Sequence, residues 1–167
     1  MDALTINPFI ESVRETFERM MGVAVEMGTP RPMPSLSNSV DIIGVIGLTG
    51  TAQGVVALRF PVVTALAIVS RLIGIDTRAV DRDTIDAVGE LVNIVAGGAK
   101  SRFKGHTISV SLPTVVRGDL CRLSKATDAI WVEIPFTSPV GAFCMIVTIR
   151  PSTHTPRERE HESACSR

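Results

Sequence analysis

A long uncharged stretch between Asp41 and Arg59 limits what this chain can fold into. Seventeen consecutive residues there carry no charge, and a second uncharged stretch follows, from Arg59 to Ser70. A membrane-spanning helix needs roughly 20 predominantly apolar residues. The first stretch instead contains four glycines and the turn-like sequence TGTAQG. It therefore predicts two strands, 40–48 and 54–60, joined by a turn, in a protein that does not enter the membrane.

Hydrophobic periodicity predicts three helices around this hairpin. Asparagine followed by proline is typical of a helix start, and glycine of a helix end. Aspartate is a common N-terminal cap. The predicted helices are 7–21, which begins at Asn7-Pro8, then 62–73, which Gly74 ends, and 83–103, which Asp83 caps.

Three further strands are predicted after the third helix, at 106–116, 130–136 and 141–149. In the second of them apolar residues alternate with Trp131, Glu133 and Pro135, the pattern of a half-buried strand. Each half of the chain then consists of a helix followed by a hairpin, which indicates an internal pseudo-repeat. The expected fold class is α+β, or mixed α/β, with a sheet covered by helices on one side.

Length and composition fit one domain, 1–150, followed by a polar tail, 151–167. The tail has almost no apolar residue and is expected to be disordered. Seventeen basic and seventeen acidic residues cancel and aromatic residues are few, so nucleic acid is not an expected partner. The N-terminus does not resemble a signal peptide, and three widely spaced cysteines suit free thiols in a reducing compartment. The chain is expected to be cytoplasmic.

The third helix carries a line of side chains on its predicted solvent-facing side. At 100° per residue the apolar residues share one face, and Asp86, Glu90, Asn93 and Gly97 lie together on the other. Asp86 could serve only the helix dipole, and Glu90 only helix propensity. Asparagine and glycine, however, are poor choices at mid-helix, where each glycine costs roughly 1 kcal/mol relative to alanine. The line as a whole indicates a docking surface.

Each residue of this line suits a task on a partner protein. Glu90 offers a charge to a cationic side chain. The carboxamide of Asn93 has donor and acceptor atoms, so it can hold a water and steady an oxyanion. Gly97 lets a partner's backbone approach, and Ile94 is expected as an exposed apolar contact beside the line. No Ser-His-Asp or Cys-His set is apparent, which disfavours a hydrolase of small molecules.

The stretch Asp86-Ala-Val-Gly-Glu90-Leu-Val-Asn93-Ile-Val-Ala-Gly97 resembles the signature of the CheC/CheX/FliY family of chemotaxis phosphatases. That signature is an acidic or Ser residue followed by Glu-x-x-Asn. Segment 111–118 resembles the proline-containing strand that follows in the family, and the order of elements matches over roughly residues 5–150. The resemblance implies an antiparallel-rich sheet covered by long helices. The first helix lacks Glu-x-x-Asn, so one site per chain is expected, as in the CheX members.

The resemblance also implies the activity, namely hydrolysis of the aspartyl phosphate of a CheY-type response regulator, which ends a chemotaxis signal. Asn93 would position the attacking water and Glu90 would pair with the receiver's active-site lysine, with Asp86 in support. The chain would need no metal or cofactor of its own, because the receiver carries its own Mg²⁺. A homodimer is expected. Two rival functions stay open: binding the phosphorylated receiver without hydrolysis, and an interaction module of the flagellar switch.

Overall fold

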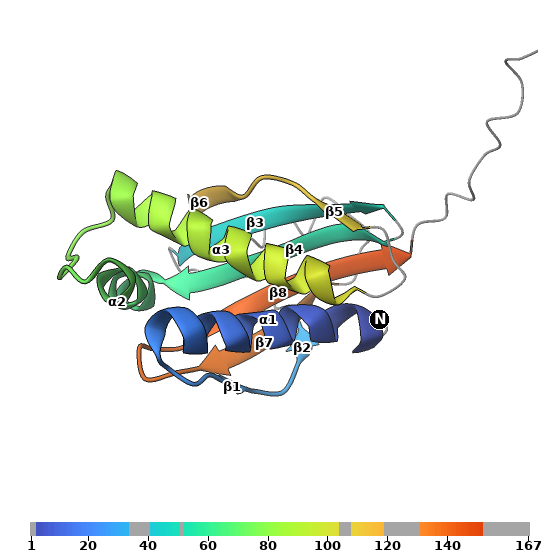
Figure 1. Ribbon diagram of the computed structural model, residues 1–167, viewed down its shortest axis with the longest axis horizontal. Helices are drawn as coiled ribbons and strands as arrows, with labels where there is room; N and C mark the ends of the chain where they lie inside the picture. The colour runs from blue at the N-terminus through green and yellow to red at the C-terminus, as the bar shows by residue number, and fades with distance from the viewer. Residues whose placement is uncertain (1–2, 34–40, 51, 104–107, 119–130, 152–167) are drawn as a thin grey trace, which may run out of the picture.

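The computed structural model describes residues 3–33, 41–50, 52–103, 108–118 and 131–151 of the chain. These residues form three helices and eight strands (Figure 1). The helices are α1 (Ala3–Met21), α2 (Val62–Ile73) and α3 (Arg82–Arg102). The strands are β1 (Glu26–Met27), β2 (Arg31–Pro32), β3 (Asp41–Gly50), β4 (Ala52–Pro61), β5 (Ile108–Val110), β6 (Thr114–Gly118), β7 (Val132–Thr137) and β8 (Phe143–Pro151).

The sheet is built from two antiparallel hairpins that meet at its centre (Figure 1). β3 pairs with β4, β7 pairs with β8, and the inner strands β4 and β8 pair with each other. The strand order is β1-β7-β8-β4-β3-β5, with β2 also on β7 and β6 also on β3. A long helix precedes each hairpin in the chain, α1 the first and α3 the second. This arrangement confirms the α+β class and the helix–hairpin repeat.

The three helices cover one face of the sheet, and the main core lies between the helices and that face (Figure 1). The apolar stripe that predicts the first helix, Phe9, Val13 and Phe17, is buried there. The ring of Phe17 stacks on Phe143 of β8, with ring centroids 4.6 Å apart. Burying one such side chain stabilises the fold by about 1.5–3 kcal/mol. Among the described residues no helix is long and apolar enough to cross a membrane.

Glycines on two sides determine how closely α3 packs. Val92 of α3 lies on Gly44 of β3, where a Cβ atom would overlap the valine. Ser12 of α1 packs against Gly98 and donates a hydrogen bond of 2.7 Å to the carbonyl oxygen of Val95. Both contacts need a residue without a side chain at the point of closest approach. They bury the apolar side of α3 and leave its opposite side to solvent.

The start of α1 differs from the prediction. The helix begins at Ala3 rather than at Asn7, and Pro8 lies inside it. A proline inside a helix removes one backbone hydrogen bond and crowds the carbonyl oxygen four residues earlier, so the turn before Pro8 needs support from packing. Ile6 packs against the core, which favours the extra turn.

The start of α3 also differs, because Asp81 rather than Asp83 is the N-cap. Its carboxylate accepts a hydrogen bond of 2.8 Å from the backbone N–H of Thr84 and another from the Thr84 hydroxyl. These two bonds lower the pKa of the Asp81 carboxyl below its ordinary value. The end of α2 is as predicted: Gly74 adopts φ 71° and donates to the carbonyl oxygen of Ser70.

The strand predicted at 106–116 is interrupted. Its described part forms β5 and β6, separated by 111–113, because Pro113 has no N–H to donate to a ladder. Ser111 keeps this connection on β3: its N–H donates to the carbonyl oxygen of Gly47 at 2.9 Å, and its hydroxyl accepts from the Gly47 N–H at 3.0 Å.

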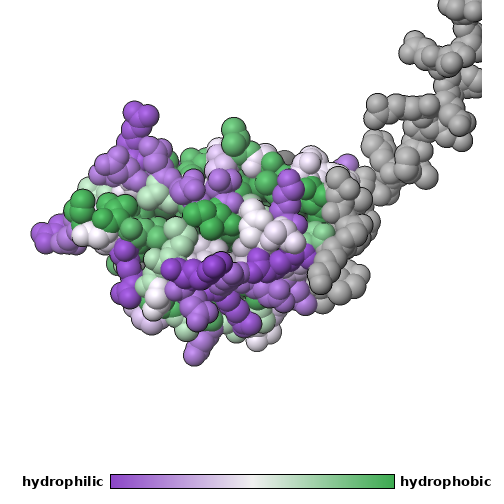
Figure 2. All heavy atoms as spheres, viewed as in Figure 1, coloured by the Kyte–Doolittle hydropathy of each residue, from purple (hydrophilic) through white to green (hydrophobic). Residues whose placement is uncertain are grey.

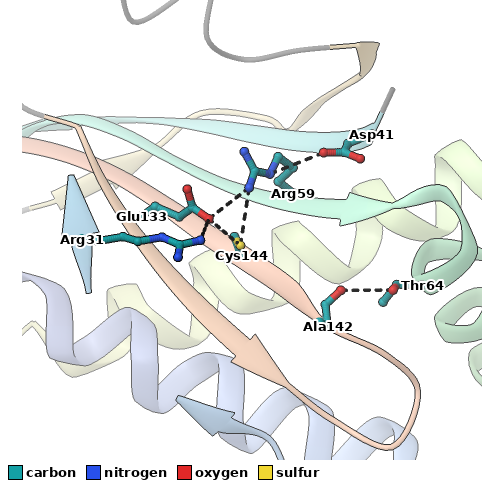
Figure 3. Close-up of polar contacts among 7 residues, drawn as sticks. All are labelled: Arg31, Asp41, Arg59, Thr64, Glu133, Ala142 and Cys144. Carbon is teal, nitrogen blue, oxygen red and sulfur yellow. Dashed lines mark hydrogen bonds and ion pairs between the residues drawn. The ribbon is translucent and has the colours of Figure 1, made fainter. Parts of the chain in front are cut away.

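The face of β7 that points away from the helices is more covered than a half-buried strand predicts: Glu133 is buried and Pro135 half-buried, and only Thr137 is exposed. Glu133 lies on the face away from the helices, yet it is fully buried. Its Oε1 atom accepts from Arg31 at 3.1 Å, from Arg59 at 3.0 Å and from the thiol of Cys144 at 3.0 Å (Figure 3). Alternation along a strand reports which face a residue occupies and not whether that face is covered. Here the second face has its own buried apolar cluster of Ile43, Ala57, Trp131 and Ile146.

Several predictions fall outside the described residues. Strand β8 ends at Pro151, and the remainder of the predicted tail, 152–167, is not described. Cys121 and Cys165 are likewise outside the described residues. Cys144 is a free thiol, as expected.

Candidate functional site

The exposed side of α3 carries the residues that the helical wheel places there. Asp86, Glu90, Asn93 and Gly97 are all exposed. We call these four residues the α3 line. The opposite side of the helix is buried and consists of Val88, Leu91, Val92, Val95, Ala96 and Ala99, with Thr84 at its start. The period of the apolar residues therefore predicts correctly which way the polar residues face.

Glu90 and Asn93 are available to another molecule. Within the described part of the chain, neither side chain takes part in a hydrogen bond or an ion pair. Residues three apart are neighbours on a helix surface, so the carboxylate and the carboxamide project from one patch. Asparagine is a weak helix former. An exposed Asn93 without a partner in the described fold therefore points to an interaction outside it.

Asp86 has a local partner at the start of the α3 line. Its carboxylate lies 3.7 Å from the Nε atom of Arg82, one turn earlier, and both side chains are exposed. Such a pair contributes typically less than about 1 kcal/mol. It therefore does not prevent Asp86 from turning toward a partner, and the supporting contact assigned to Asp86 stays a prediction.

The two adjacent glycines of α3 have different surroundings. A Cβ atom at Gly98 would overlap the hydroxyl of Ser12. At Gly97, in contrast, nothing lies within 4 Å of the position a Cβ would take. Gly98 is thus required by the packing of α1 on α3, whereas the described structure gives no packing reason for Gly97.

A groove of about 700 Å³ runs beside the α3 line, between α1 and α3. Met20 of α1 and Ile94 of α3 contribute apolar walls, and charged residues, among them Arg19, border it. Arg102 pairs with Glu15 across the gap between the two helices. Viewed onto the helices, Figure 2 shows apolar and neutral surface between the hydrophilic surface of α1 and that above it on α3. We call this feature the α1–α3 groove.

Ile94 differs from its prediction, because it is half-buried in the wall of this groove rather than fully exposed. The wheel of a single helix cannot show where a second helix lies. Sequence reasoning missed the groove for the same reason. The sequence of α1 contains two residues that the structure places unexpectedly. Ser12 is polar but buried, and Met20 is apolar but 42% exposed.

The described residues include no group of three or more His, Cys, Asp or Glu side chains placed to hold a metal ion. The chemistry that the α3 line offers is accordingly that of a carboxylate and a carboxamide presented on an open surface. Such groups bind and orient; neither is enclosed in a pocket of its own.

Comparisons with known proteins agree with the resemblance carried by Glu-x-x-Asn. The model of the chemotaxis phosphatase CheX family matches residues 42–137, a range that contains the whole α3 line. The CheY-P phosphatase CheX of Thermotoga maritima is 33% identical over 121 residues, which are 71% of this chain and 78% of that protein.

Solved structures share the fold. A CheC-like superfamily protein from Shewanella sp. PV-4 superposes with a TM-score of 0.78 at 26% identity, covering 90% of this chain and 99% of that one. CheX in the CheX–CheY–BeF₃–Mg²⁺ complex from Borrelia burgdorferi gives a TM-score of 0.74 at 22% identity, covering 87% and 97%. With the family model and the Thermotoga relative, these matches lead to one conclusion: the chain belongs to the CheX family of chemotaxis phosphatases.

Proposed function

We propose that this chain dephosphorylates a CheY-type response regulator, and that Glu90 and Asn93 act directly on the receiver. The observation that carries the proposal is the pair of exposed, unpartnered side chains on α3, inside the segment that matches the CheX family. The Thermotoga relative is named a CheY-P phosphatase, and the Borrelia structure is a complex of CheX with CheY. Both names support a receiver as the partner.

The proposed reaction is an in-line displacement at phosphorus. A water attacks the phosphoryl group, the bond to the aspartyl oxygen breaks, and inorganic phosphate and the free carboxylate result, with the water's protons passing to phosphate and solvent. Asn93 accepts a hydrogen bond from this water through its carboxamide oxygen and donates one to a phosphoryl oxygen through its NH₂ group. Because phosphoryl transfer depends mainly on positioning and charge stabilisation, no general base is needed from this chain.

Glu90 is assigned to anchoring. Its carboxylate pairs with the active-site lysine of the receiver and so fixes the register in which Asn93 meets the phosphoryl group. Mg²⁺ held by the receiver offsets the charge of the phosphoryl oxygens, and we propose that this chain contributes no metal of its own. We also propose a homodimer, which sedimentation equilibrium tests directly.

Phosphate release from a phosphorylated receiver tests the assignment of Asn93. Asn93→Ala removes the water-positioning amide from a surface site, so the fold should persist while kcat falls about a hundredfold, equivalent to about 2.7 kcal/mol of barrier. Val63→Ser on α2, where Val63 is 74% exposed, is a control on another helix and should retain wild-type turnover.

Two results would count against the proposal. Wild-type turnover by Asn93→Ala would remove the catalytic assignment. A wild-type chain that binds the BeF₃-loaded receiver without accelerating phosphate release would instead identify a binding module.

A further inference from the structure

We propose that the α1–α3 groove is a second part of the receiver-binding surface. In this arrangement a loop of the receiver crosses α3 at Gly97 and places an apolar side chain between Ile94 and Met20. The inference rests on the proposed function and adds to it a binding site that the α3 line alone does not contain.

The groove and the α3 line form one continuous surface. Residues three and four apart are neighbours on a helix, so Ile94 in the groove wall adjoins both Glu90 and Gly97 of the line. A receiver that brings its phosphoryl group to Asn93 must therefore also lie over the mouth of the groove.

Gly97 indicates where the partner's backbone passes. Gly44 and Gly98 have packing reasons, since a Cβ at either would overlap a neighbouring side chain, and a Cβ at Gly89 would meet Val115 of β6 at 3.4 Å. At Gly97 no atom of a packed neighbour among the described residues lies within 4 Å of the Cβ position, although glycine at mid-helix costs roughly 1 kcal/mol relative to alanine. The fold gains no contact in return for the cost of glycine at position 97. The cost is explained if the backbone of another chain occupies the space beside Gly97, where it can approach the helix more closely than a side chain would permit.

The composition of the groove suits an apolar anchor from a protein. Met20 is 42% exposed and Ile94 is half-buried, so both leave apolar surface uncovered. Charged groups border this surface, with Arg102 already neutralised by Glu15. An apolar centre within a polar rim is the usual anatomy of a protein interface, and methionine adapts its shape to different partners.

Two other occupants fit less well. A small-molecule site is normally enclosed and supplies convergent polar groups, but this groove is open and its arginine at the α1–α3 contact is already paired. A second copy of the chain seated here would lie over Glu90 and Asn93, because the groove adjoins them, and would block the receiver.

Affinity for the BeF₃-loaded receiver, measured by isothermal titration calorimetry, tests the groove directly. Met20→Ser removes an apolar wall of the groove, and Gly97→Leu fills the crossing point with a good helix former whose Cβ has open space in the described fold. We expect each change to raise Kd at least fivefold, equivalent to about 1 kcal/mol, a loss that only a minority of interface residues produce when truncated. In phosphate release the loss should appear in KM rather than in kcat. Val63→Ser on α2, where Val63 is 74% exposed, is the matched control and should bind as wild type does.

The outcomes separate this inference from the proposed function. If Asn93→Ala loses turnover while Met20→Ser and Gly97→Leu bind the receiver like the wild type, the groove proposal alone is overturned. If Asn93→Ala keeps full turnover, the proposed function fails regardless of the groove variants. If the groove variants change the oligomeric state and leave the receiver's Kd unaltered, the groove is an interface between copies and the inference is wrong.

Discussion

Of the two adjacent glycines in α3, the fold requires Gly98, and we propose that a partner requires Gly97. Both occupy positions where alanine would be the better helix former. Only Gly98 is in contact with α1, through Ser12, whose hydroxyl is committed to the carbonyl oxygen of Val95. The sequence alone shows two residues that are unfavourable inside a helix. The structure gives a packing reason for one of them, Gly98.

Alanine at each position gives a paired prediction for stability. Gly97→Ala adds a methyl group in open space and should raise the free energy of unfolding by about 0.5–1 kcal/mol. Gly98→Ala gains the same helix propensity but displaces the Ser12 hydroxyl and breaks its buried hydrogen bond, a loss of about 1–3 kcal/mol. Urea denaturation of the two variants should therefore place Gly98→Ala below Gly97→Ala by that amount. Equal stabilities would mean that Ser12 does not hold α1 against α3 in this way.

The exposure of a side chain was predictable where it depends only on the helix or strand that carries it. The exposure of Asp86, Glu90 and Asn93 depends only on the period of their own helix, and it was correctly predicted. The half-burial of Ile94 depends on α1, and the full burial of Glu133 depends on a second apolar cluster across the sheet. Neither distant element is encoded in the local pattern, so both predictions failed.

The buried carboxylate of Glu133, on β7, links four strands of the sheet through hydrogen bonds. Glu133 accepts hydrogen bonds from Arg31 of β2, Arg59 of β4 and Cys144 of β8 (Figure 3). Burial acts to raise the pKa of Glu133, but the hydrogen bonds from Cys144 and Arg31 and the charge of Arg59 outweigh it and leave that pKa below its ordinary value. Burial, together with the bond to Glu133, raises the pKa of Cys144 to about 11. The thiol thus stays protonated at neutral pH.

This cluster predicts a pH-dependent stability. The pKa of Glu133 is lower in the folded state than in the unfolded state, where it is about 4.3. Ionised Glu133 therefore stabilises the fold above that pH, and its contribution is lost as the pH falls through the folded-state pKa. Glu133→Gln leaves Arg59 with only part of its compensation, and should lower the free energy of unfolding on the order of 3 kcal/mol at pH 7.

Urea denaturation of the wild type and Glu133→Gln between pH 3 and pH 8 checks this prediction. The difference between the two proteins should be constant from pH 6 to pH 8 and should begin to shrink as the pH falls through about 4.3, where the Glu133 carboxyl of the unfolded wild type starts to take up a proton. A difference that stays the same down to pH 3 would show that the charge of Glu133 is not what stabilises the sheet.

Element boundaries were predictable where the controlling residue is nearby. The span 62–73 for α2 and its end at Gly74 agree with the sequence, because a glycine in the left-handed region ends a helix locally. The first residue of α1 was not predictable from Asn7-Pro8, since packing of Ile6 decides it. Short strands such as β1 and β2 exist only through pairing with β7, and the proline-rich sequence around them favours a loop.

For the whole molecule, the internal repeat places α1 and α3 in corresponding roles that have diverged. Both helices precede a hairpin and lie on the same face of the sheet (Figure 1). Only α3 carries Glu-x-x-Asn; α1 instead supplies Ser12, Glu15 and Met20, which brace α3 and form the α1–α3 groove. In the proposed function, α3 presents the groups that act on the receiver, and α1 supports α3 and completes the binding surface.

The class of the fold could be predicted from the sequence, but the strand order could not. Alternation and turns define hairpins, whereas docking β4 against β8 joins two hairpins that are far apart in the chain. Side-chain pattern assigns faces and does not choose neighbours among strands of similar apolar character. The family resemblance implied an antiparallel-rich sheet but gave no strand order, which comes from the structure.

In the proposed function, α3 reaches into the reaction centre of another protein. A crystal structure of this chain with a BeF₃-loaded receiver measures that most directly, through the distance from the Asn93 carboxamide to the phosphoryl mimic and its attacking water. We expect this distance to be about 3 Å, within hydrogen-bond reach. We also expect the carboxylate of Glu90 to pair with a receiver lysine. A complex in which the receiver binds elsewhere, and the α3 line faces solvent, would contradict it.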